Sequence, residues 1–106
     1  MHVMTLKNGS LKPIFEAIES ELIFATNKFP SNDHRLTTLI KEVEELSTAL
    51  LDQYKDATPE RAEDYNQKIF VEAVQVASMA IRVMTEGDRA FIYHPPILIG
   101  KLEGEG

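Results

Sequence analysis

The chain has 106 residues, which is the size of one domain, because two independent hydrophobic cores rarely fit into so short a chain. Its 43% hydrophobic and 26% charged residues are typical of a folded domain and not of a disordered segment. Since there is no cysteine, disulfides and zinc–thiolate sites are excluded. The net charge of -6 argues against binding a nucleic-acid polymer, but it is compatible with binding a nucleotide through a metal ion.

Membrane and targeting segments are not evident in the sequence. No apolar run approaches the roughly 20 residues needed to span a bilayer, and residues 1–7 lack the apolar core of a signal peptide. We therefore expect a cytoplasmic protein without membrane contact. The five glycines lie at 9, 87, 100, 104 and 106, so a P-loop and a dinucleotide-binding turn are both excluded.

The first predicted helix spans residues 10–26. Ser10 is a plausible N-cap, and Pro13 falls in the first turn, where its missing N–H does little harm. Apolar residues recur at steps of three and four and form one stripe: Leu11, Ile14, Phe15, Ile18, Leu22 and Ala25. The segment from Phe29 to Asn32 ends this helix.

Two longer helices are predicted over residues 33–54 and 59–86. The first of these has an apolar stripe that we expect to be buried: Leu36, Leu39, Ile40, Val43, Leu46 and Leu50. The second begins at Thr58 as N-cap with Pro59 as its first residue, and it ends at Gly87.

The second half of the last helix is unusually apolar. Of its 16 residues from Ile69 to Met84, 12 are apolar, and such a helix is buried on most sides. Three helices of one short chain can hardly bury all of this surface, so we expect a homodimer or a dimer of dimers. The prediction is one all-α domain over residues 1–106. Its helical bundle has a core completed by homodimerisation, and residues 88–106 form an extended C-terminal arm.

Polar side chains follow one strip on each of the two longer helices. Glu42 and Glu45 are three residues apart and lie on one face, away from the predicted buried stripe. On the last helix one strip contains Lys68, Glu72, Gln75, Met79 and Arg82. Antiparallel packing of the two helices would bring Glu42, Glu45 and Glu72 together around a hard cation such as Mg²⁺. Lys68 and Arg82 could then neutralise phosphate oxygens.

A simpler interpretation of these charges is a solvated surface. On that interpretation Glu72 pairs with Lys68 and Arg82 pairs with Glu86, each pair four residues apart and contributing a few tenths of a kcal/mol.

Residues Leu39–Leu50 resemble the first motif of the MazG-like nucleotide pyrophosphohydrolases, and Glu72–Ala80 resemble the second. These all-α enzymes have Glu-x-x-Glu on one helix and Glu-x-x-Asp on the next. The 26 residues between Glu45 and Glu72 fall within the family's usual gap. The resemblance covers about residues 14 to 86.

The resemblance implies hydrolysis of a nucleoside triphosphate between its α and β phosphates, giving monophosphate and pyrophosphate. It implies Mg²⁺, with Mn²⁺ as a substitute, held by Glu42, Glu45, Glu72 and the residue at position 75. Glu45 could instead orient the attacking water as a base. Gln75 stands where the typical motif has Asp, and an amide coordinates through oxygen but carries no charge. Glu44 stands where many members have Gly, on a flank that we expect to lie away from the site.

Other hypotheses remain open at this point. A non-catalytic helical interaction module of the same fold would be consistent with Gln75, and a phosphoribosyl-ATP pyrophosphohydrolase is a third alternative. His34 could cap the surface of its helix or contact substrate, and Phe29 could fix the loop to the core or stack on a base.

Overall fold

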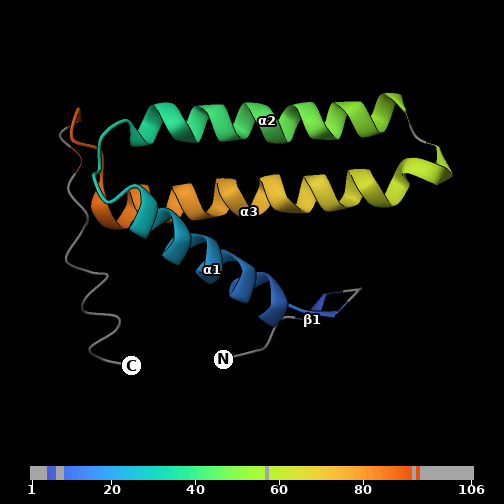
Figure 1. Cartoon of the computed structure of the whole chain (residues 1–106), viewed down its shortest axis with the longest axis horizontal. Coiled ribbons are helices and arrows are strands. Elements are labelled where there is room, and N and C mark those ends of the chain that lie inside the picture. Colours follow the sequence, from blue (N-terminus) through green and yellow to red (C-terminus); the bar gives the residue numbers. More distant parts are fainter. Residues whose placement is uncertain (1–4, 7–8, 57, 92, 94–106) are drawn as a thin grey trace.

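The computed structural model describes residues 5–6, 9–56, 58–91 and 93, and this part of the chain is almost entirely helical. Two long helices, α2 (Arg35–Lys55) and α3 (Ala62–Glu86), run antiparallel side by side, and α1 (Lys12–Lys28) crosses them obliquely (Figure 1). A short antiparallel pairing of β1 (Thr5–Leu6) with β2 (Gly9–Ser10) precedes α1. The all-α class predicted from the sequence is confirmed.

The helix starts differ in detail from the prediction. The first helix begins two residues late, at Lys12, because Ser10 pairs with Thr5 in the short hairpin. The last helix opens with a single 3₁₀ turn, η1 (Pro59–Arg61), before α3 begins at Ala62. Thr58 makes no side-chain capping bond there, although Pro59 is the first residue as predicted.

The apolar stripe predicted to be buried on α2 is largely exposed within the chain, so that prediction was wrong. Leu36, Ile40, Val43 and Leu50 are 37%, 52%, 44% and 47% exposed. The side of α2 that packs on α3 is instead the one with Ala49, which is completely buried. A small side chain there lets the two helices approach closely, and the larger apolar residues are left on another face.

The hydrophobic core of the described chain is correspondingly small. Ala49 is its one fully buried hydrophobic residue, whereas Phe70, Val71 and Met84 of the apolar half of α3 are 41–49% exposed. Large apolar side chains of α1 are more exposed still, with Phe15 at 61%. None of the helices in the described ranges is long and apolar enough to cross a membrane.

Where α2 begins, its N-terminus is capped from a distant part of the sequence. The N-cap position is His34, which has a left-handed φ of 60° and makes no side-chain capping bond. Asp88, which follows α3, accepts hydrogen bonds from the backbone N–H of Leu36 at 2.8 Å and of Ala90 at 2.9 Å. Because both bonds favour the ionised carboxyl, the pKa of Asp88 is held below its usual value of 3.8.

The described start of the predicted C-terminal arm therefore lies on the bundle. Gly87 ends α3 with φ 70°, a backbone conformation that favours glycine. The Tyr93 hydroxyl then donates a hydrogen bond to the Met84 carbonyl at 3.1 Å. Position 92 and positions 94–106 of the predicted arm lie outside the described residues.

Replacing Asp88 with Asn should lower the melting temperature, because the ionised carboxylate stabilises the N-terminus of α2. The stability contributed by a lowered pKa is present above the usual value of 3.8 and is lost as the pH falls through the folded-state pKa. Thermal unfolding followed by circular dichroism should thus show a deficit for Asp88→Asn near neutral pH that shrinks as the pH falls below 3.8. A deficit that stays constant with pH would contradict this account of the cap.

Candidate metal site

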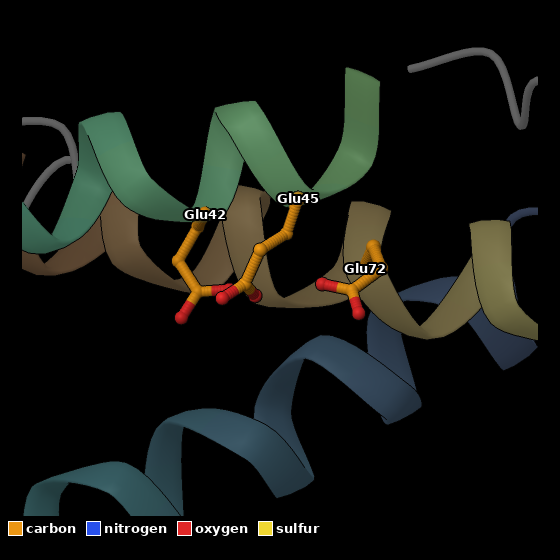
Figure 2. Close-up of side chains that lie close together, drawn as sticks. All are labelled: Glu42, Glu45 and Glu72. Carbon is orange, nitrogen blue, oxygen red and sulfur yellow. The ribbon is translucent and has the colours of Figure 1, made fainter. Parts of the chain in front are cut away.

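Three carboxylates from two helices meet on one side of the α2–α3 pair. Glu42 and Glu45 extend from α2 and Glu72 extends from α3, on the side where α1 crosses (Figure 2). Each offers one oxygen, and these oxygens all lie within 4.8 Å of one another. All three side chains are half-buried, so solvent can reach the cluster but does not surround it. The structure thus brings together the glutamates that the sequence analysis selected.

Burial and mutual repulsion raise the pKa values of two carboxyl groups in this cluster. The pKa of Glu42 is raised, first by burial and then by the negative charges of Glu45 and Glu72 and by a hydrogen bond with Glu45. The pKa of Glu72 is raised for the same two main reasons, burial and the charge of Glu45. Lys41 and Lys68 act in the opposite direction, Lys41 on Glu42 and Lys68 on Glu72. A positive ion among the three oxygens would relieve the remaining repulsion.

Gln75 completes the cluster from the next turn of α3. With its amide nitrogen facing the carboxylates, it donates to Glu42 Oε2 at 3.0 Å and to Glu72 Oε2 at 3.2 Å. Turning the amide over places its oxygen in the same position. Position 75 therefore has two uses here, as a donor to carboxylates or as a fourth oxygen facing a cation.

An open hollow of about 540 Å³ adjoins the cluster and carries two lysines. Its lining is contributed by both long helices: Lys41, Glu44, Glu45, Thr48, Lys68 and Glu72. Lys68 was expected at the site, whereas Lys41 and Thr48 were not assigned a role. Glu44, expected on another flank, is not part of the carboxylate cluster, although it lines the same hollow as Glu45. The relevant signal was the spacing of Lys41, Glu44, Glu45 and Thr48, which at steps of three and four share one side of a helix.

Arg82 lies away from this hollow and is only 2% exposed. Its guanidinium donates to the carbonyls of Ala25 and Phe29 near the end of α1 and pairs with Glu86 at 3.5 Å. The i,i+4 pair with Glu86 that the simpler interpretation predicted is thus present. The matching pair between Lys68 and Glu72 is not among the ion pairs of the described residues. These contacts favour a structural use of Arg82 over its predicted use in substrate binding.

His34 and Phe29 lie near the junction of α1 and α2. His34 is exposed and caps nothing with its side chain, and it stands eight residues before Glu42, about 12 Å along the helix. Phe29 is 56% exposed, with the Lys28 ammonium 5.4 Å from its ring centre, so it is not fixed into the core of the described chain. A role of either residue in binding substrate stays a prediction.

No family model, no curated protein and no solved structure gave a significant match to this chain. The resemblance of residues 39–50 and 72–80 to the MazG-like motifs therefore depends on those residues alone. What it implies about activity is a proposal, considered below.

Replacing Glu42 with Gln should stabilise the metal-free protein, because one of three repelling charges is removed. We expect a gain on the order of 0.5–1 kcal/mol, since solvent screens a half-buried cluster. The same variant should lose most of the stabilisation that Mg²⁺ gives the wild type, because a ligand is gone. Urea unfolding with chelator and with Mg²⁺ measures both effects.

Glu19→Gln is the matched control, since Glu19 is an exposed glutamate of α1 outside the cluster. It should leave the response to Mg²⁺ unchanged. A Glu42→Gln protein that is less stable without metal, yet keeps the full response to Mg²⁺, would contradict the assignment.

Proposed function

We propose that this chain is a Mg²⁺-dependent nucleoside triphosphate pyrophosphohydrolase acting on free nucleotides in the cytoplasm. The observation that carries the proposal is the convergence of Glu42, Glu45 and Glu72 from two helices to within 4.8 Å. The resemblance of the sequence around these glutamates to the MazG-like motifs also supports it, because their order and spacing are similar.

The donor set fits Mg²⁺. Magnesium binds oxygen at 2.0–2.1 Å in an octahedron, so two of its ligands are at most about 4.2 Å apart. Three ligands of one octahedron include at least two adjacent pairs about 3 Å apart, so side-chain rotation has to draw together oxygens that lie within 4.8 Å of one another in this structure. Glu42, Glu45 and Glu72 would hold the ion, and Gln75 would present its amide oxygen. When bound, Mg²⁺ supplies charge that polarises the α-phosphate and favours ionisation of the attacking water.

The remaining residues of the hollow suit a polyphosphate. Lys41 and Lys68 stand on opposite helices beside the carboxylates and are not among the ion pairs of the described residues. Their ammonium groups bind the oxygens of the β and γ phosphates, which leave together as pyrophosphate. Glu45, which lines both the cluster and the hollow, orients the water for attack on the α-phosphorus.

One observation favours a second function. Gln75 can satisfy Glu42 and Glu72 by hydrogen bonds without any metal, which suits a helical interaction module that has lost catalysis. Such a module would retain the fold and release no pyrophosphate from any nucleotide.

Pyrophosphate release tests the proposed function. Incubation with a panel of ribo- and deoxynucleoside triphosphates should yield pyrophosphate with Mg²⁺ and none with chelator. Glu72→Gln should reduce kcat by at least about 100-fold while the circular dichroism spectrum is retained, because a charged metal ligand is lost. Release of single phosphate, or full activity of Glu72→Gln, would contradict the proposal, and silence across the panel would favour the interaction module.

We further propose that two copies of the chain pair through the exposed apolar face of α2. This face lies at helical spacing and is 37–85% exposed residue by residue: Leu36, Ile40, Val43, Leu50, Leu51 and Tyr54. The opposite side of α2 packs on α3, and among the described residues none covers these apolar side chains fully. A second copy brings an identical face, as a two-fold axis requires.

A charge placed on this face should separate the copies. Ile40→Glu should shift the mass measured by light scattering from dimer to monomer, because a buried unpaired carboxylate is costly. Gln67→Glu, at an exposed position of α3 outside this face, should leave the dimer intact. A monomeric wild type would contradict the proposal, as would a dimer that tolerates Ile40→Glu.

A further inference from the structure

The line of α2 residues that lies closest to α3 contains no large apolar side chain. Arg35, Glu42 and Ala49 follow each other at intervals of seven on the side of α2 that meets α3. Two of these side chains are charged and the third is a methyl group. Interlocking large apolar side chains, which usually set the register of paired helices, are therefore scarce along this line.

An ion-pair network joins the two helices at one end, with two buried arginines around the Glu86 carboxylate, whose side chain is 36% exposed. Glu86, at the end of α3, accepts a hydrogen bond from Arg35 Nη2 at 3.1 Å with one carboxylate oxygen, and its other oxygen lies 3.5 Å from Arg82 Nε. Both arginines are 2% exposed. One carboxylate thus joins the first residue of α2 to α3.

The same arginines also bind the chain that precedes α2. Arg35 donates to the Ser31 carbonyl, and Arg82 donates to the carbonyls of Ala25 and Phe29. Arg35, Glu86 and Arg82, which we name the arginine–glutamate triad, thus join both long helices to the chain that precedes α2. At the same end of the bundle, Asp88 adds its bond to the N-terminus of α2.

The triad is close enough to the carboxylate cluster to control its geometry. Arg35 precedes Glu42 by two turns, about 10 Å, and Arg82 follows Glu72 by roughly 15 Å along α3. Because helices are stiff over such lengths, a shift at the triad is carried to the cluster. A slip of one residue moves the helix by 1.5 Å, which exceeds the few tenths of an ångström that Mg²⁺ coordination tolerates.

We propose that Glu86 is a positioning residue for the cation site. By pairing with Arg35 and Arg82, it sets the register of α2 on α3 and so holds the ligand oxygens of both helices in one coordination sphere. The inference rests on the proposed cation site. Ion pairs that include buried charges often add little net stability, and fixing register is their best-documented use.

Replacement of the whole triad by apolar residues distinguishes an effect on the position of the ligand oxygens from an effect on the stability of the fold. The variant Arg35→Met/Glu86→Leu/Arg82→Met removes the ion pairs without leaving an uncompensated buried charge. It should keep a helical circular dichroism spectrum and bind Mg²⁺ at least tenfold more weakly by isothermal titration calorimetry. If the triple variant is unfolded, Glu86→Gln replaces it in the test. This single variant should fold and bind Mg²⁺ at least threefold more weakly than the wild type.

Asp56→Asn is the matched control, because Asp56 accepts from Arg61 at 2.8 Å and from Tyr65 at 2.9 Å at the opposite end of the same helix pair. The Asp56 carboxylate is about as exposed as that of Glu86, 38% against 36%, but its arginine partner is 62% exposed. The loss of Asp56 should change Mg²⁺ affinity by less than twofold. Equal Mg²⁺ affinity of the folded variants and the wild type would overturn the positioning role alone, as would an equal loss in Asp56→Asn. A wild type that binds no divalent cation would overturn the proposed function and the inference with it.

Discussion

Three negative charges held within 4.8 Å repel one another, and the arrangement of this protein depends on keeping them there. Burial and mutual repulsion raise the pKa values of Glu42 and Glu72, so the metal-free cluster is in tension with its surroundings. Gln75 relieves part of it through two donated hydrogen bonds. A divalent cation would reduce the repulsion further, because it neutralises negative charge, whereas the neutral amide of Gln75 only donates hydrogen bonds to it. The repulsion destabilises the metal-free protein, and the same repulsion would favour the binding of a cation.

The same helix pairing explains the exposed apolar surface. Because α2 turns its carboxylates and Ala49 toward α3, its large apolar side chains face outward. A chain that used its apolar stripe to cover α3 would have a larger core of its own, but its glutamates would lie apart. The small core of the described chain and the grouping of the carboxylates thus both follow from which side of α2 packs on α3. Association with a second copy would bury the apolar side chains that the small core leaves exposed.

Periodicity and turn residues predicted the three helices to within two residues at most boundaries, because Pro, Gly and helical spacing act locally. The face of α2 that packs on α3 could not be predicted in this way. Apolar residues at helical spacing identify a face that favours burial, but they do not identify the helix or the chain that covers it. The carboxylate cluster was predicted from spacing and resemblance. The roles of Arg35 and Asp88 were missed, because their partners lie more than 50 positions away in the sequence.

The central claim is that two helices of one chain form a divalent-cation site. Anomalous diffraction from crystals grown with Mn²⁺ tests it most directly, because the ion itself is located. The account predicts one strong peak between the carboxylates of Glu42, Glu45 and Glu72, with the Gln75 amide oxygen turned toward it. An empty cluster in crystals that bind Mn²⁺ elsewhere, or that bind none at millimolar concentration, would contradict the account.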